Sequence, residues 1–388
     1  MFEYFENMYP WNLATIMVLN SGGQIDEVHE ALSSVRGSGF SDVNSANAAF
    51  VSAWRGAAEK VESLAQDDER NGNFRAAGGK YSRAANYYFA AERQAPARSP
   101  ERMALYQRML QAFAKYAELR REPCQRVEIP LGDEASVPAL FVPGKGDASK
   151  KPCMIQFDGL DVLKEWIYFT GIAQELSERG VSTLIVDHPG VGEALRLRGL
   201  TRVVEIERAA SACVDWLETQ ENVDADRIGM MALSLGGYYS MRSVAFEPRF
   251  RCGVAWGAMY DFGAACRSVV ADGSHRSVHN FLEHLRWVTG TDSDDDAMAV
   301  AAQMTLNGLL DRIKCPILIV HGENDRQVPP QAAERTFSEA VNSVGKELKI
   351  HKIAEGGCEH CSVDNLGITV DYMAHWIART LAAPRELA

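Results

Sequence analysis

The feature that most constrains the fold is an alternation of short apolar runs and amphipathic helical segments that begins near Pro152. Strands that are apolar throughout and are separated by helices are typical of a mainly parallel sheet covered by helices on both faces. The sequence therefore predicts an α/β fold with a doubly wound sheet. The expected strands are CMIQFD (153–158), VSTLIVD (181–187), RIGMMAL (227–233), RCGVAW (251–256), CPILIV (315–320) and ELKIHKI (347–353).

The chain before this alternation has a different pattern. Residues 1 to about 120 show only helical spacing, most clearly at 75–94 and from 101 to about 121, and Pro123 ends the last helix. The runs CQRVEIP (124–130) and VPALFVP (137–143) are expected to form a β-hairpin around the turn LGDEAS. We therefore predict an all-α N-terminal domain, 1–122, and a catalytic domain, 123–388.

One interval inside the second domain is too long for a single crossover helix. It separates Trp256 from Cys315, whereas a crossover helix needs only about 10–15 residues. We expect a helical insertion at about 262–312.

Composition excludes some classes of protein. There are 40 Lys+Arg and 52 Asp+Glu, giving a formal net charge of −12, which disfavours binding to nucleic acid or to anionic membranes. No window resembles a signal peptide or a spanning helix. The sequence predicts a soluble, cytoplasmic protein without a nucleic-acid or membrane partner.

The strand 227–233 leads directly into Ser234 and then into a helix, which is typical of a nucleophile elbow. Ala232 and Gly236 are small enough for the sharp turn, although Ala232 stands where glycine is usual. For an isolated motif the alternative is a serine that only caps the helix. The elbow also predicts an acid after a later strand and then a histidine, and both are present. Ser234 is therefore the predicted nucleophile.

The predicted acid and base follow the last two strands. Asp325 lies in the polar loop 321–329, where Glu323 is the alternative, and His360 lies in the glycine-containing loop 355–361. Serine becomes a strong nucleophile when an imidazole takes its proton, and a carboxylate fixes the tautomer of that imidazole. We predict a catalytic triad of Ser234, Asp325 and His360.

Two backbone amides are expected to stabilise the oxyanion. Leu235 N–H, at the start of the helix after Ser234, is the first. The second is expected from the loop after 153–158, from Leu160 or, as the alternative, from Gly159. An ordinary strand-to-helix turn is the competing interpretation of this loop.

Cys358 and Cys361 flank the predicted base as a C-x-x-C pair. A structural zinc site needs four ligands, and the sequence has no second pair of this kind. We expect reduced thiols here, with no metal ion and no cofactor.

Nearly the whole chain resembles the α/β-hydrolases with an N-terminal helical cap. This group includes 2,6-dihydroxypseudooxynicotine hydrolase, the fungal yellowish-green pigment heptaketide hydrolases and, more distantly, the fermentation-respiration switch protein. Ser234, Asp325 and His360 match the triad of this group. The matching stretches are 78–92, 157–161, 187–192, 233–237, 256–257 and 360–361.

The resemblance implies hydrolysis of a carbon–carbon bond beside a ketone, in a β-diketone, polyketide or acylated aromatic substrate. A carboxylesterase or lactonase is the first alternative, and a non-catalytic regulatory binding protein on a hydrolase scaffold is the second. The N-terminal domain is expected to close the pocket. The expected substrate contacts are Asp158, Asp161, Tyr260, Asp261, Trp54, Tyr88 and Trp287.

The resemblance also implies a homodimer. The aromatic residues near the N-terminus are candidates for its contact, and the alternative is that they pack on helices of their own domain. These residues are Phe2, Tyr4, Phe5, Tyr9 and Trp11.

Overall fold

The computed structural model describes residues 2–38, 42–132, 135–273 and 275–382, which fall into two compact units. Unit 1 consists of Met1–Cys124 and Gly273–Trp287, and unit 2 of Gln125–Asp272 and Val288–Ala388. The helical N-terminal region is confirmed. Part of the segment expected as an insertion into the second domain belongs to unit 1.

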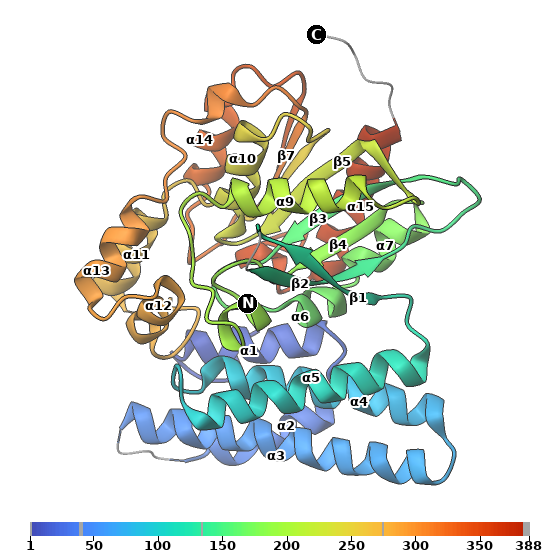
Figure 1. Ribbon diagram of the computed structural model, residues 1–388. Helices are drawn as coiled ribbons and strands as arrows, with labels where there is room; N and C mark the ends of the chain where they lie inside the picture. Colours follow the sequence, from blue (N-terminus) through green and yellow to red (C-terminus); the bar gives the residue numbers. More distant parts are fainter. Residues whose placement is uncertain (1, 39–41, 133–134, 274, 383–388) are drawn as a thin grey trace. The chain divides into compact units, whose positions relative to one another are not determined.

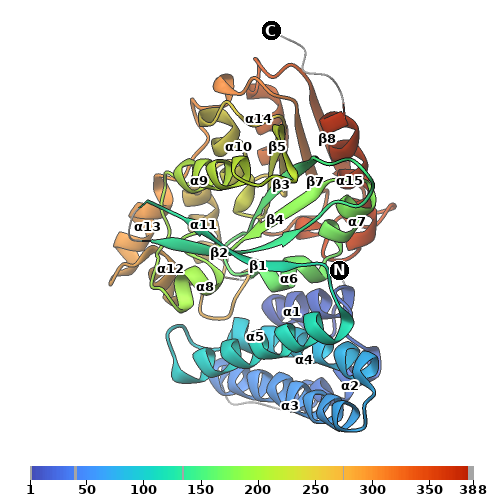
Figure 2. The same cartoon turned by 45° about the vertical axis from the view of Figure 1, so that its right-hand side comes forward.

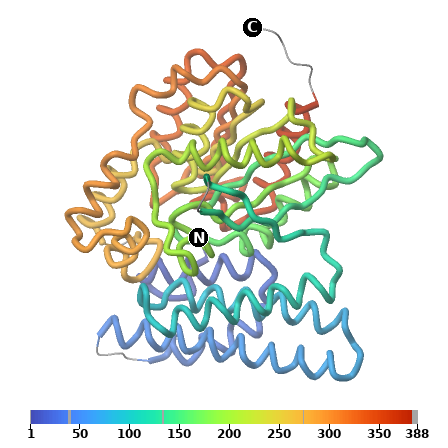
Figure 3. Tube along the Cα trace, in the orientation of Figure 1, coloured from blue at the N-terminus to red at the C-terminus, as the bar shows by residue number. Residues whose placement is uncertain are grey.

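Unit 1 is built from helices. Within it α4 packs against both α3 and α5, which lie on either side of it (Figure 1). The chain turns back after each long helix, as the blue part of the trace shows (Figure 3). The helices are α1 (Tyr9–Asn20), α2 (Ile25–Arg36), α3 (Val43–Arg70), α4 (Phe74–Gln94), α5 (Pro100–Arg120) and the first part of α12 (Phe281–Thr289).

Local sequence explains where two of these helices begin. The carboxylate of Asp42 accepts hydrogen bonds from the backbone N–H groups of Asn44 and Ser45, both at 2.9 Å, at the start of α3. Ser99 accepts one from Arg102 N–H at 3.1 Å, and Pro100 occupies the first turn of α5. Both are N-caps of the preferred residue types.

The core of unit 1 combines aromatic rings with a buried carboxylate, that of Glu62. Trp54 and Tyr88 are completely buried. Tyr88 Oη donates to Glu62 at 2.6 Å, and Arg108 donates to the same carboxylate at 2.6 Å. These contacts tie α3, α4 and α5 together through one carboxylate.

Unit 2 contains an eight-stranded sheet in the order β1-β2-β4-β3-β5-β6-β7-β8. Only the β1/β2 and β2/β4 pairs are antiparallel, so the mainly parallel sheet is confirmed. Every strand overlaps a predicted one. The strands are β1 (Gln125–Pro130), β2 (Ser136–Val142), β3 (Lys151–Phe157), β4 (Ser182–Val186), β5 (Val223–Leu233), β6 (Gly253–Trp256), β7 (Ile317–Gly322) and β8 (Lys346–His351).

The first two strands form the expected hairpin. Gln125 pairs with Phe141 and Pro130 pairs with Ser136. Residues 133 and 134 of the expected turn lie outside the described residues.

Helices cover both faces of the sheet. α9 and α10 pack on one face and α7 and α15 on the other (Figures 1 and 2), which confirms the doubly wound architecture. The long interval after β6 holds α11, α12 and α13, of which α12 belongs to unit 1 up to Trp287. The helices of this unit are α6 (Lys164–Phe169), α7 (Ile172–Glu178), α8 (Gly192–Arg196), α9 (Glu207–Glu218), α10 (Gly236–Phe246), α11 (Phe262–Asp272), α13 (Asp294–Ala302), α14 (Gln331–Glu339) and α15 (Leu366–Ala382), with 3-10 turns at Leu310–Arg312 and His360–Ser362.

The parallel strands bring four loops to one edge of the sheet. β3, β5, β7 and β8 are all parallel to their neighbours in this part of the sheet, so the loops that follow them leave from the same edge. These loops contain the residues singled out from the sequence. Among the described residues, no helix has the length and apolar character required to cross a bilayer.

Candidate active site

Ser234 lies at a sharp turn between β5 and α10 with a left-handed backbone conformation, φ 61°. Its backbone N–H donates to Trp256 O at 2.8 Å, which ties the turn to the end of β6. A Cβ at Gly236 would lie only 2.6 Å from the Cβ of Ala232. The turn therefore has room for a side-chain carbon at one of these two positions, which explains how Ala232 is accommodated.

Ser234, His360 and Asp325 form a continuous hydrogen-bonded chain. Ser234 Oγ lies 2.7 Å from His360 Nε2, and His360 Nδ1 lies 2.8 Å from Asp325 Oδ2. Asp325 Oδ1 accepts two further hydrogen bonds, from backbone N–H groups of residues 327 and 328, both at 2.9 Å. In the neutral ring, with Nδ1 donating to the carboxylate, Nε2 carries no proton and can accept the serine proton.

The alternative acid, Glu323, has other contacts. Its carboxylate accepts from Lys352 Nζ at 3.0 Å and from Ile353 N–H at 3.1 Å. Asp325 is thus the acid that contacts His360.

Burial and charge act in opposite directions on the acid and the base. Burial alone would lower the pKa of His360, but the charge of Asp325 and the hydrogen bond to it raise the pKa of this imidazole well above its ordinary value. Burial would raise the pKa of Asp325, but His360, His321 and the backbone N–H donors hold it below its ordinary value. The pair therefore favours an ionised carboxylate that supports a strongly basic imidazole.

A second set of contacts joins the loop that carries Asp325 (321–329, the acid loop) to the loop that carries His360 (355–361, the base loop). Glu359, which is completely buried, accepts from Asn324 Nδ2 at 2.7 Å and from Arg326 Nε at 3.4 Å. The backbone N–H of Asn324 also donates to Cys358 O at 2.8 Å. The residues beside Asp325 are thus bonded to the residues beside His360. Sequence analysis missed this role of Glu359, for which its place next to the predicted base was the only signal.

His321, at the end of β7, also holds the acid loop and was not predicted to do so. Its Nδ1 accepts from Ala258 N–H at 3.1 Å, so Nε2 carries the proton in the neutral ring. Nε2 lies 2.9 Å from Val328 O and 3.4 Å from Asp325 Oδ2. His321 therefore links the loop after β6 to the loop that carries Asp325.

The loop after β3 approaches Ser234 closely. A Cβ at Gly159 would lie 2.9 Å from Ser234 Cβ and 3.4 Å from Ser234 Oγ, so glycine is required for this contact. Leu235 directly precedes α10, whose first N–H groups have no partner within the helix. These positions suit the predicted oxyanion contacts of Leu235, Leu160 and Gly159, which remain predictions.

Asp158 belongs to a buried group of charged side chains behind this loop. Lys164 Nζ contacts three carboxylates, those of Glu165 at 2.7 Å, Asp187 at 2.8 Å and Glu193 at 3.2 Å. Burial raises the pKa of Asp158 well above its ordinary value, and the charges of Asp187 and Glu165 raise it further. Its neutral form is therefore favoured. Nearby Asp161 is also buried.

Two of the predicted substrate contacts have structural partners in unit 2. Tyr260 Oη donates to Glu339 Oε2 at 2.6 Å, and its ring lies 4.0 Å from the guanidinium carbon of Arg335. Asp261 Oδ1 accepts from Ala264 N–H at 2.7 Å at the start of α11. Contact of either residue with substrate remains a prediction.

The other three lie in unit 1, where they pack with neighbours of the same unit. The ring centroids of Trp54 and Tyr87 are 5.6 Å apart, and Tyr88 donates to Glu62 as described above. Trp287 is buried under the guanidinium of Arg102, 4.8 Å from its ring centroid. Their contact with substrate also remains a prediction.

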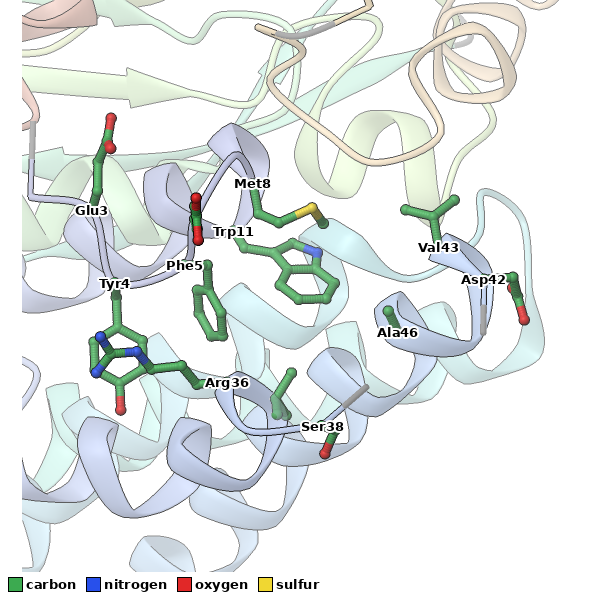
Figure 4. Close-up of a pocket in the computed structure, with 12 residues that line it drawn as sticks. Glu3, Tyr4, Phe5, Met8, Trp11, Arg36, Ser38, Asp42, Val43 and Ala46 are labelled. Carbon is green, nitrogen blue, oxygen red and sulfur yellow. The ribbon is translucent and has the colours of Figure 1, made fainter. Parts of the chain in front are cut away.

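The N-terminal aromatic residues mostly pack within unit 1. Phe5, Tyr9 and Trp11 are buried, whereas Phe2 is 53% exposed. Phe5 and Trp11 lie beside a hollow of about 770 Å³, which Figure 4 shows between the N-terminal segment and helices α2 and α3. This packing is what the alternative to a dimer contact predicted.

Comparison with curated proteins finds relatives along most of the chain. It is 28% identical over 372 residues to the 20-hydroxy-prefusarin hydrolase FUS2 of Gibberella moniliformis, covering 86% of this chain and 88% of the relative. It is 28% identical over 283 residues to the 2,6-dihydropseudooxynicotine hydrolase of Paenarthrobacter nicotinovorans, covering 72% and 71%. The resemblance inferred from the sequence is confirmed.

Comparison with solved structures finds a similar fold in a hydrolase of the same kind. The solved structure of the 2,6-dihydroxy-pseudo-oxynicotine hydrolase superposes with a TM-score of 0.75 at 25% identity, covering 96% of this chain and 97% of the other. The architecture is therefore that of an α/β-hydrolase, and the protein is an enzyme of the hydrolase class. The model of the prolyl oligopeptidase family matches residues 168–383, more than half of the sequence, and the chain therefore belongs to that family.

Proposed function

We propose that this hydrolase uses Ser234 as a nucleophile to cleave a carbon–carbon bond beside a ketone, by a retro-Claisen reaction through an acyl-enzyme. In this proposal His360 is the general base and Asp325 orients it. The N–H groups of Leu235 and Leu160 hold the oxyanion. The substrate class is a β-diketone, a polyketide or an acylated aromatic compound.

The observation that carries the proposal is the hydrogen-bonded chain from Ser234 through His360 to Asp325, with distances of 2.7 and 2.8 Å. The left-handed conformation of Ser234 supports it, because a non-glycine residue adopts that conformation at a cost that active sites tolerate. The hydrolases of Gibberella and Paenarthrobacter to which the chain is similar support a small organic substrate, since their names give 20-hydroxy-prefusarin and 2,6-dihydropseudooxynicotine.

The reaction divides into acylation and hydrolysis. Ser234 Oγ attacks the ketone carbon while His360 takes its proton, and the electron pair of the carbonyl moves to the oxyanion. When the carbonyl reforms, the carbon–carbon bond breaks and its electron pair leaves on the carbon fragment, which His360 protonates. Water, deprotonated by His360, then attacks the acyl-enzyme, releases the carboxylic acid and restores Ser234.

The leaving carbon sets the substrate requirement. A simple carbanion is a very poor leaving group, so the substrate must spread the charge into a second carbonyl or a phenolic ring. Ester cleavage does not need this assistance, because an alkoxide or phenoxide leaves with the charge on oxygen. This difference separates the two enzymatic candidates.

The test compares an aryl β-diketone with an aryl ester of similar size. Wild type is expected to convert the diketone to a carboxylic acid and a ketone, and Ser234→Ala is expected to lose about 10⁴-fold or more of that rate. Ester turnover alone would replace the proposal with a carboxylesterase or lactonase. A folded wild-type protein in which a fluorophosphonate does not label Ser234 would favour the regulatory binding protein instead.

A homodimer and a cytoplasmic location remain part of the proposal. The exposed Phe2 is the described aromatic residue near the N-terminus with the most surface to offer a second copy. A monomeric mass by light scattering at micromolar concentration would contradict the dimer.

A further inference from the structure

Arg202 is a buried arginine whose side chain faces backbone oxygens of the loop that follows β3. Its exposed fraction is 4%. Its Nη2 lies 3.4 Å from Gly159 O, 3.3 Å from Leu160 O and 3.4 Å from Gly190 O. Nη1 donates to the hydroxyl of Tyr239, on α10. The four acceptors are all neutral oxygens, so the cation is held by dipoles.

These contacts fix the direction of two successive peptide groups. In a planar trans peptide the carbonyl of one residue and the N–H of the next point in opposite directions. Because Gly159 O faces Arg202, the N–H of Leu160 points away from the arginine. The same holds for Leu160 O and the N–H of Asp161. Gly159 itself touches Ser234, since its Cβ would lie 2.9 Å from Ser234 Cβ.

His188 faces a further carbonyl of the same loop. His188 Nε2 lies 3.4 Å from Asp158 O, so three successive carbonyls, 158 to 160, face His188 or Arg202. The His188 ring packs edge-on against Tyr239, with centroids 4.9 Å apart. Burial lowers the pKa of His188, and the charge of Arg202 lowers it further, to about 3. Arg202 is thus the charged group of the pair at neutral pH.

We propose that Arg202 is a positioning residue that orients the peptide groups of the loop at 158–161, so that the N–H of Leu160 faces the oxyanion formed at Ser234. The inference rests on the proposed serine mechanism. Arg202 acts through this backbone and, by its bond to Tyr239, also holds the loop to the helix that begins after the nucleophile. Removing it is expected to weaken oxyanion stabilisation and to leave ground-state binding unchanged.

The test uses inactivation by a fluorophosphonate, whose phosphoryl oxygen occupies the oxyanion position. The rate constant kinact and the binding constant KI are measured separately for wild type, Arg202→Ala, Arg202→Lys and Tyr239→Phe. Loss of a donor costs about 10²–10³-fold, so a misoriented donor in Arg202→Ala is expected to lower kinact about 10–100-fold, with KI within about threefold. Added guanidinium is expected to restore part of kinact. Lysine, which lacks the planar fork, is expected to restore little.

Arg242→Met is the matched control. Arg242 is a largely buried arginine on the same helix as Tyr239, and its guanidinium pairs with Glu207 at 2.6 and 2.8 Å. Removing it also breaks the contacts of a buried cation, and it should leave kinact within about twofold of wild type.

The results separate this inference from the proposed function. Wild-type kinact in folded Arg202→Ala, or a change in KI alone, would overturn the role of Arg202 while the labelling of Ser234 still supported the proposed function. If Arg202→Ala does not fold, Tyr239→Phe tests the role of Arg202 instead. Its kinact is expected to fall two- to fivefold, about 0.4–1 kcal/mol. An unchanged kinact in this variant would contradict that role. Absence of labelling in wild type would reject both.

Discussion

The two units bury polar groups in different ways. In unit 1 the buried carboxylates are bonded by side chains of neighbouring helices, as Glu62 is by Tyr88 and Arg108, and Glu92 by Arg102. In unit 2 the buried carboxylate of Asp325 begins a chain of hydrogen bonds that ends at the hydroxyl of Ser234. Buried polar groups in the helical unit join its helices, whereas Asp325, at the edge of the sheet, holds His360 against Ser234.

The contacts of a buried carboxylate therefore indicate whether it contributes mainly to stability or mainly to turnover. A carboxylate bonded by two neighbouring helices should contribute to stability and little to turnover. A carboxylate that holds an imidazole against a strained serine should contribute to turnover and little to stability. Four substitutions test this division.

Asp325→Asn should have the largest effect. The asparagine keeps the size of the side chain but loses the charge and favours the wrong imidazole tautomer, which costs about 10⁴-fold in kcat in the serine protease triad. The free energy of unfolding should change by much less than the corresponding activation energy. Steady-state kinetics and urea denaturation of the same variant measure both quantities, and Glu323→Gln is the control.

The same variant has a predicted pH dependence. The charge of Asp325 raises the pKa of His360, and the reaction requires the neutral imidazole. Activity should therefore fall as the pH falls through this raised pKa. Loss of the charge removes the cause of the increase, so the acid limb of the residual activity of Asp325→Asn should move to lower pH. An unchanged acid limb would show that another group sets it.

Arg102→Met tests unit 1. Arg102 Nε lies 2.7 Å from Glu92 Oε1, and both side chains are almost completely buried. Removing one partner of such a pair costs about 3–5 kcal/mol, because a buried charge is left without compensation. The labelling rate of Ser234 should stay within about twofold of wild type at a temperature where the protein is folded.

The control for this variant is Arg55→Met. Arg55 pairs with Glu101 at 2.9 Å, and the side chains are 41% and 45% exposed, so less than about 1 kcal/mol should be lost. Equal destabilisation by the two substitutions would contradict the special role of the buried pair.

Glu359→Gln tests the contacts between the acid loop and the base loop. An amide in place of the carboxylate sets a donor against Asn324 or Arg326, so Asp325 and His360 lose part of their alignment. We expect kcat to fall about 10–100-fold, corresponding to about 1.4–2.7 kcal/mol, with KM within about threefold. Glu355→Gln, an exposed residue of the neighbouring turn that pairs with Lys349 at 3.0 Å, should have wild-type kinetics.

Sequence patterns predicted the central strands well because β3, β4, β6 and β7 are buried along their whole length, whereas the edge strands β1 and β8 are partly exposed. Apolar burial and β-branched composition define each strand locally, and the order of elbow, acid and histidine then follows from the fold. The close contacts of Ser234, Asp325 and His360 are consistent with that order. Patterns of this kind are strongest where one physical requirement, here burial on both faces, acts on every residue of an element.

The remaining features depend on contacts between residues far apart in the sequence. Arg202 lies in a loop between α8 and α9 and reaches carbonyls more than 40 residues earlier. No local pattern distinguishes this arginine from an exposed one. Conversely, Trp54 and Tyr88 have the helical spacing of core residues, and the structure buries both completely. Identifying pocket residues from aromatic character alone is unsafe for this reason.

The smallest effect concerns the backbone of the nucleophile. Ser234 has φ 61°, a conformation that costs a residue with a Cβ about 1 kcal/mol or more and costs glycine little. Ser234→Gly and Ser234→Ala both remove the hydroxyl, but only glycine relieves the strain. Relief of about 1 kcal/mol of strain is offset by about 0.4–1 kcal/mol for the greater entropy of glycine in the unfolded chain. Urea denaturation should therefore give Ser234→Gly a free energy of unfolding equal to that of Ser234→Ala or up to about 0.6 kcal/mol above it. A value for glycine about 0.4–1 kcal/mol below that of alanine would equal the entropy difference alone, and the turn would then store no strain.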